Sequence, residues 1–207
     1  LAKAGDFDAI KKMPGGTFVR SPAWLVGAIY NGRIAPVAPY GICGAIWYQA
    51  ESNCGRGEDP RDYRHKQRAL VQGWRQAWNN ENLPFYYVQL PQWKSYAWTY
   101  AREEQLQAMK VEGTGMAVTI DLDNANDIHP PNKIDVGERL ARWPLAKLYG
   151  KKIPFSGPLF RKAKFRNAEV AVGFDYAKEG LMVGRIEGVG KIIEDKDGVL
   201  NGFELVG

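Results

Sequence analysis

Three short apolar runs alternate with amphipathic segments through the middle of the chain, and this alternation constrains the fold more than any other feature. The runs are Ile42–Gln49, Phe85–Leu90 and Gly115–Leu122, and each suits a strand that is buried on both faces. Strands that alternate with helices predict a parallel sheet, because each parallel pair needs a long crossover connection. The sequence therefore predicts an α/β fold in which helices cover both faces of a parallel sheet.

Helices are predicted over residues 59–79, 100–111 and 133–149. The first carries an apolar stripe at helical spacing, formed by Tyr63, Leu70, Trp74 and Trp78. The third holds Pro144 in its interior, where a proline costs ~3 kcal/mol unless the helix bends, so we expect a bend there. Gly150 is placed to cap the end of that helix.

The pattern changes after Pro154, which predicts an α/β domain over residues 1–155 and a β-rich segment over residues 156–207. Short β-like runs separated by turn residues occupy the second region: Glu169–Phe174, Leu181–Ile186 and Phe203–Val206. They indicate the start of an antiparallel module. We expect a missing segment or a partner chain to cover this module and complete the domain.

Composition disfavours several classes of function. Hydrophobic residues make up 45% of the chain and charged residues 25%, as in a globular protein. The sequence holds no uninterrupted run of apolar residues long enough to span a bilayer, so no membrane partner is predicted. The net charge of +5 is spread over predicted helix faces and sheet ends, which argues against a nucleic-acid partner.

The cysteines and the first residue leave the cellular location open. Cys43 and Cys54 fit no metal-binding pattern and are compatible with one disulfide or with two thiols. The sequence begins at Leu1, which is typical of a processed, cleaved or excerpted chain. It therefore leaves open whether a signal peptide has been removed. A secreted or periplasmic location is favoured.

Polar residues follow two of the predicted strands: Gln49–Asn53 after the first and Asp121–His129 after the third. In open parallel sheets, ligands bind at the carboxyl ends of the strands. His129, with Asp127 two residues before it, suits a general base in a loop at this edge, although it could also only fasten its loop. The other histidine, His65, is predicted to be an ordinary helix residue.

The first polar cluster offers donors and acceptors for a substrate. Gln49 could donate to a developing oxyanion, and Glu51 could orient a partner or pair with an arginine. Ser52 and Asn53 could instead cap backbone amides of their own loop. No G-x-S-x-G elbow surrounds Ser52, and none of the four serines of the chain has a recognisable nucleophile setting.

No metal or cofactor is predicted. Asp121, Asp123 and Asp127 resemble a calcium loop only superficially, because Ala125 stands where an oxygen ligand is needed. Among the aromatic residues, the best candidates for stacking against a sugar lie in a non-periodic loop after the second strand: Trp93, Tyr96 and Trp98.

Five blocks in this order resemble the sialate O-acetylesterase family: Tyr30–Pro36, Ile46–Asn53, Gly115–Asp121, Asn126–Pro130 and Ser156–Leu159. The resemblance covers roughly residues 20–160. It implies the SGNH-hydrolase fold, a three-layer α/β/α sandwich, and the removal of acetyl groups from sugar hydroxyls, sialic acids among them, by serine chemistry without a metal.

The resemblance also implies roles for residues. His129 is then the catalytic histidine, and Gln49–Asn53 lines the oxyanion side of the site. The nucleophilic serine is expected in a Gly-Gln-Ser-Asn block that these 207 residues lack, so we expect a segment outside the chain to supply it. Family members usually have glycine in place of Ala50, where a methyl group could crowd the substrate.

Three readings of the function stay open. The first is a carbohydrate O-acetylesterase acting on O-acetylated sugars, with a serine–histidine dyad or a triad that includes Asp127. The second is a non-catalytic carbohydrate-binding or interaction protein on the same fold. The third is a cysteine hydrolase that pairs Cys54 with His129.

Overall fold

The computed structural model describes residues 27–38, 40–55, 57–122, 126–129, 131–167 and 169–178. The chain divides into two compact units, Leu1–Cys43 with Gln72–Leu83 and Gly44–Val71 with Pro84–Gly207. The predicted runs Leu181–Ile186 and Phe203–Val206 lie outside the described residues.

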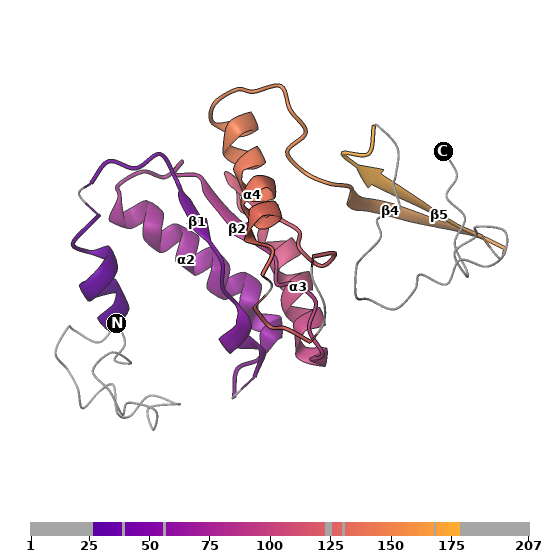
Figure 1. Ribbon diagram of the computed structural model, residues 1–207, viewed down its shortest axis with the longest axis horizontal. Helices are drawn as coiled ribbons and strands as arrows, with labels where there is room; N and C mark the ends of the chain where they lie inside the picture. The colour runs from indigo at the N-terminus through magenta and orange to yellow at the C-terminus, as the bar shows by residue number, and fades with distance from the viewer. Residues whose placement is uncertain are drawn as a thin grey trace. The chain divides into compact units, whose positions relative to one another are not determined.

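A three-stranded parallel sheet lies in the second unit, with the strand order β1-β2-β3 (Figure 1). The strands are β1 (Ala45–Trp47), β2 (Phe85–Val88) and β3 (Thr114–Ala117). Phe85 pairs with Ala45 on one side and with Thr114 on the other. Each strand overlaps one of the predicted apolar runs, which confirms the parallel sheet.

Among the described residues, three α-helices accompany the sheet: α2 (Tyr63–Ala77), α3 (Tyr96–Ala108) and α4 (Lys133–Lys147). Shorter turns of helix are η3 (Tyr30–Ile34), η4 (Glu51–Cys54) and η5 (Pro60–Asp62). Asn132 caps α4 by accepting the backbone N–H of Asp135 at 3.1 Å, so this helix begins where it was predicted. In contrast, α3 begins four residues before its predicted start at residue 100 and includes Tyr96 and Trp98.

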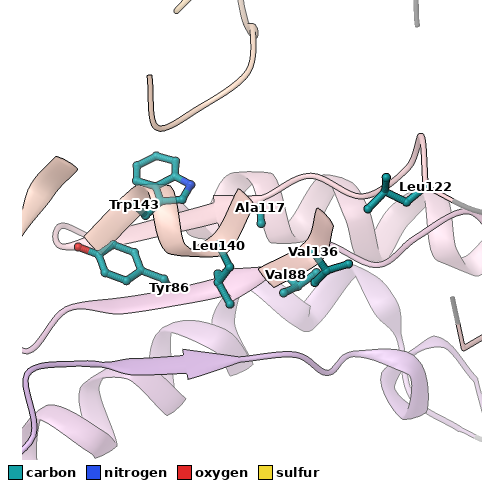
Figure 2. Close-up of a cluster of buried hydrophobic side chains, with 7 residues drawn as sticks. All are labelled: Tyr86, Val88, Ala117, Leu122, Val136, Leu140 and Trp143. Atoms are coloured by element: carbon teal, nitrogen blue, oxygen red, sulfur yellow. The ribbon is translucent and has the colours of Figure 1, made fainter. Parts of the chain in front are cut away.

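Helices cover both faces of the sheet, as predicted. On one face, Tyr86 and Val88 of β2 pack in a buried cluster with Leu140 and Trp143 of α4 (Figure 2). On the other face, the hydroxyl of Tyr87 donates to the backbone oxygen of Gln105 in α3 at 2.7 Å. Successive residues of a strand point to opposite faces, so β2 separates two layers of helix. The α/β/α arrangement is confirmed.

A close approach fixes the position of α4. The indole Nε1 of Trp143 donates to the backbone oxygen of Met116 in β3 at 3.0 Å. A side chain at Gly115 would place its Cβ 2.9 Å from Cε2 of Trp143 and nearer still to two other indole carbons. Glycine at this position lets the indole lie directly on the strand.

A separate antiparallel hairpin follows α4, formed by β4 (Leu159–Arg166) and β5 (Glu169–Asp175) (Figure 1). The run Glu169–Phe174 was predicted, but β4 was not, because charged residues interrupt its apolar ones. In the hairpin, Ala163 pairs with Val172 and Phe165 with Val170, so apolar residues oppose one another at alternate positions of this part of β4. Among the described helices, none has the length and apolar character needed to cross a membrane.

The end of α2 belongs to the other unit. There Trp74 and Trp78 stack with their ring centroids 5.0 Å apart, and the indole of Trp78 donates to the backbone oxygen of Tyr40 at 2.9 Å. The two tryptophans of the predicted stripe therefore pack locally within this unit.

Candidate functional site

The loops that follow the three parallel strands meet in one hydrophobic cluster, which we call the edge cluster. Its buried members are Ala50, Tyr63, Leu90, Trp98 and Ala101, with Cys54, Trp93 and Ile128 packed against them half-buried. Ala50 and Cys54 come after β1, Leu90 and Trp93 after β2, and Ile128 after β3. The structure thus brings the two predicted polar loops together at the carboxyl edge of the sheet.

A hydrogen-bond network shapes the loop after β1. The hydroxyl of Tyr63 donates to the backbone oxygen of Gln49 at 2.8 Å, and the side-chain Nε2 of Gln49 donates to Oδ1 of Asn53 at 2.9 Å. The backbone N–H of Ala50 donates to the Glu51 carboxylate at 2.9 Å. Gln49 is half-buried, and its Nε2 carries a second hydrogen that can serve a substrate.

The remaining members of this loop divide into anchored and exposed residues. Asn53 donates through Nδ2 to Glu58 at 3.3 Å, and Glu58 also pairs with Lys66. Ser52 is exposed within η4. Asn53 therefore links Gln49 to the charged pair, whereas Ser52 is open to solvent.

The methyl group of Ala50 does not lie on the exposed surface of the site. Ala50 is fully buried in the edge cluster. The Ala50 side chain is part of the packing that joins the loops.

Side-chain amides and hydroxyls hold the ends of β2 and β3. Gln105 is 1% exposed; its Oε1 accepts the N–H of Leu90 at 2.9 Å, and its Nε2 donates to the oxygen of Val88 at 3.2 Å. Thr119 is also buried and donates to the oxygen of Gln89 at 2.7 Å. These bonds satisfy buried backbone groups where the strand ladder stops.

The loop after β3 carries His129 at its exposed end. The backbone N–H of His129 donates to the Asp127 carboxylate at 2.8 Å, while Ile128 between them packs on the edge cluster. Both His129 and Asp127 are exposed, so the imidazole is accessible from solvent. Asp127 uses its carboxylate to close the turn on which the imidazole sits.

Arg139 fastens the start of the same loop. Its guanidinium binds both oxygens of Asp121, at 2.5 and 2.7 Å, and donates to the backbone oxygen of Val118 at 2.8 Å. Burial alone would raise the pKa of Asp121, but the hydrogen bonds and charge of Arg139 outweigh it and lower that pKa. Asp121 therefore acts here as an anchor, and Asp123 lies outside the described residues.

The three aromatic candidates for sugar stacking have different environments. Trp98 is 3% exposed and belongs to the edge cluster, and Trp93 is half-buried against it with the ring centroids 6.2 Å apart. Tyr96 is 76% exposed. Only Tyr96 of the three offers most of its ring to solvent.

The thiol of Cys54 is poorly suited to be a nucleophile. Burial, followed by the charge of Glu51, raises the pKa of Cys54 to about 11, and the Sγ donates to the backbone oxygen of Ala50 at 3.4 Å. Catalytic cysteines have lowered pKa values, which favour the thiolate. The environment of Cys54 disfavours the hypothesis of a cysteine hydrolase.

Sequence reasoning missed Tyr63, Gln105 and Arg139 as residues that position the site. Tyr63 was assigned to an apolar stripe, and a glutamine or arginine on a helix is ordinarily a surface residue. A partial signal was present for Arg139, which lies on the predicted helix that directly follows the polar loop.

Sialate O-acetylesterases are among the proteins that are similar to this chain. That of Rattus norvegicus is 29% identical over 73% of this chain and 32% of the relative. That of Homo sapiens is also 29% identical, over 65% of this chain and 30% of the relative. The chain thus spans about a third of the length of the curated relatives it matches.

This chain is also similar to a solved structure and matches a family model. The crystal structure of a novel carbohydrate acetylesterase from Xanthomonas citri superposes with a TM-score of 0.67 at 37% identity, covering 72% of this chain and 36% of that one. The profile described as "Carbohydrate esterase, sialic acid-specific acetylesterase" matches residues 14–145. The chain belongs to this family of carbohydrate esterases.

Proposed function

We propose that this chain carries the histidine part of a carbohydrate O-acetylesterase that hydrolyses acetyl esters of sugars, sialic acids among them. The main support is the packing of Ile128 on the edge cluster, because it brings the loop of His129 to the loop of Gln49. A general base and an oxyanion donor must both lie close to one reacting carbonyl. Family membership supplies the class of substrate.

In the proposed mechanism, His129 takes the proton of a serine hydroxyl as the serine oxygen bonds to the acetyl carbonyl carbon. The second hydrogen of Gln49 Nε2, with backbone amides, stabilises the oxyanion. The sugar oxygen then leaves with the proton held by His129. Water attacks the acetyl-serine with His129 again as the base, which releases acetate and restores the serine.

We propose that the serine comes from a segment outside this sequence. Of the described serines, Ser52 lies in η4, Ser95 directly precedes α3, and the Oγ of Ser156 donates to the oxygen of Gly157 at 2.9 Å. Ser21 lies outside the described residues. A Gly-Gln-Ser-Asn block does not occur in the sequence, and the chain spans about a third of its relatives.

The test compares His129→Ala with His65→Ala in the intact protein, with acetate release from O-acetylated sialic acid and acetylated xylan as the readout. His65 is an exposed residue of α2 and serves as the matched control. Loss of a general base lowers kcat by about 10²–10⁴-fold. The kcat of His129→Ala should therefore fall by this factor, and the kcat of His65→Ala should stay at the wild-type value. Full activity in His129→Ala would show that the assignment is wrong.

The same measurement separates the esterase from the alternative, a non-catalytic carbohydrate-binding protein. An intact protein that binds acetylated glycans but releases no acetate would support that alternative. Turnover by the 207-residue chain alone would instead place a nucleophile within it.

A further inference from the structure

An exposed aromatic pair lies on the first turns of α3. The hydroxyls of Tyr96 and Tyr100 are 2.9 Å apart, and their rings meet edge to face with centroids 5.2 Å apart. Tyr96 is 76% exposed and Tyr100 38%. The contact of the two hydroxyls fixes the pair while leaving the Tyr96 ring open to a ligand.

A fixed guanidinium completes the patch. Arg61 of η5 lies over the Tyr100 ring, 6.0 Å from its centroid. The same side chain binds the Asp59 carboxylate through Nε at 2.9 Å and Nη2 at 2.8 Å. The hydrogen bonds from Arg61 hold the pKa of Asp59 at about 2, so the pair remains ionised and its charges balance at neutral pH.

The patch lies at the carboxyl edge of the sheet, near the candidate site. Tyr96 and Tyr100 lie on the exposed side of α3, opposite the buried face on which Trp98 joins the edge cluster, and both η4 and η5 contact this helix. Arg61 belongs to η5, which follows the loop of Gln49 along the chain. A substrate that extends from the acetylated unit past η4 and over the exposed side of α3 would meet these side chains.

We propose that Tyr96, Tyr100 and Arg61 form a subsite for a neutral pyranose ring of an oligosaccharide, next to the unit that carries the acetyl ester. This inference rests on the proposed function. The Tyr96 ring offers an apolar surface to the C–H face of a sugar, while the phenols, Arg61 and Asp59 offer donors and acceptors for its hydroxyls. The balanced charge of Arg61 and Asp59 favours a neutral sugar over an acidic one.

The kinetic test uses the intact protein and compares Tyr96→Ala with Tyr149→Ala. Tyr149 is 60% exposed after the end of α4, so the same substitution there serves as the matched control. Tyr96→Ala should raise KM for acetylated xylo-oligosaccharides about tenfold, which corresponds to 1.4 kcal/mol, and leave hydrolysis of p-nitrophenyl acetate unchanged. Equal KM values for the two variants on the oligosaccharide would overturn the subsite, as would equal losses on both substrates.

A binding measurement separates this inference from the proposed function. Deacetylated xylohexaose is titrated into the intact protein, the two variants and Tyr96→Phe, with calorimetric detection. Binding that Tyr96→Ala weakens about tenfold and Tyr96→Phe largely keeps would support the subsite, even if the protein released no acetate. Acetate release without any binding of the oligosaccharide would reject the subsite and leave the esterase standing.

Discussion

The carboxylate of Asp127 accepts the backbone N–H of His129 at 2.8 Å. An aspartate that bonds the backbone two residues on closes an Asx turn, which fixes the direction of the chain at the histidine. Asp127 thereby acts on the position of the imidazole through the loop. We infer that the proposed reaction relies on a serine–histidine dyad, with Asp127 as a positioning residue.

Asp127→Asn should therefore keep most of the activity, because an amide oxygen can accept the same N–H. We expect kcat to fall by less than about tenfold, against a fall of about 10²–10⁴ for His129→Ala. Asp127→Ala should have the larger effect of the two Asp127 variants, since it opens the turn. Acetate release by the intact protein measures all three. If Asp127→Asn were as damaging as His129→Ala, the carboxylate would act on the imidazole and the site would be a triad.

Cys54→Ala should leave the esterase activity intact. Burial and the Glu51 charge raise the pKa of Cys54 to about 11, so roughly one thiol in ten thousand is ionised at pH 7. Cys43→Ala, at an exposed position, is the control. Alkylation of Cys54 should accelerate as the pH rises toward 11, while thiol reagents at pH 7 should not inhibit. Loss of activity in Cys54→Ala with normal stability would revive the cysteine mechanism.

The sheet was predictable because its strands are uninterrupted apolar runs with helical patterns between them. The start of α3 was not predictable from the sequence. The buried face of this helix carries Glu104 and Gln105 as well as Trp98 and Ala101, so its apolar periodicity is interrupted. Both polar side chains are buried and bonded, Glu104 to Arg64 and Gln105 to the end of β2. A hydrophobic pattern cannot reveal an inward face whose polar groups are satisfied by partners distant in the sequence.

The place of the candidate site was predictable for a different reason. Carboxyl ends of parallel strands share an edge, so polar residues after two such strands must come near one another. The contacts within the site were not predictable, because an aspartate two residues before a histidine can reach the imidazole or the backbone. Which one it reaches depends on the turn, and Ile128 within that turn packs on the edge cluster, which is formed by residues distant in the sequence.

Gly115→Ala should destabilise the fold, because the new methyl would overlap the indole of Trp143. Overpacking of this kind costs about 1–3 kcal/mol, and here the indole is also held by its bond to Met116. Gly137 of α4 is exposed with open space around it, so Gly137→Ala should stabilise the protein by up to about 1 kcal/mol. Urea unfolding of both variants measures the two effects. If Gly115→Ala were as stable as the wild-type protein, α4 would be able to move away from β3 at little cost.

Arg139→Met should lower the free energy of unfolding by about 1 kcal/mol at pH 7, because Arg139 holds both Asp121 and the oxygen of Val118. The pair is partly exposed, so a larger effect is not expected. Since Arg139 holds the pKa of Asp121 below 3.8, the ion pair stabilises the fold above that pH and is lost as the pH falls through the lowered value.

The difference between wild type and Arg139→Met should therefore shrink between pH 5 and pH 2, measured by urea unfolding at several pH values. Part of it should survive in acid, because the bond to Val118 carries no titrating group. Arg142→Met is the control: Arg142 is exposed and donates to the oxygen of Pro154 at 3.4 Å, so its effect should not depend on pH. A constant difference for Arg139→Met across the same range would mean that Asp121 contributes nothing and that the backbone bond alone fastens the loop.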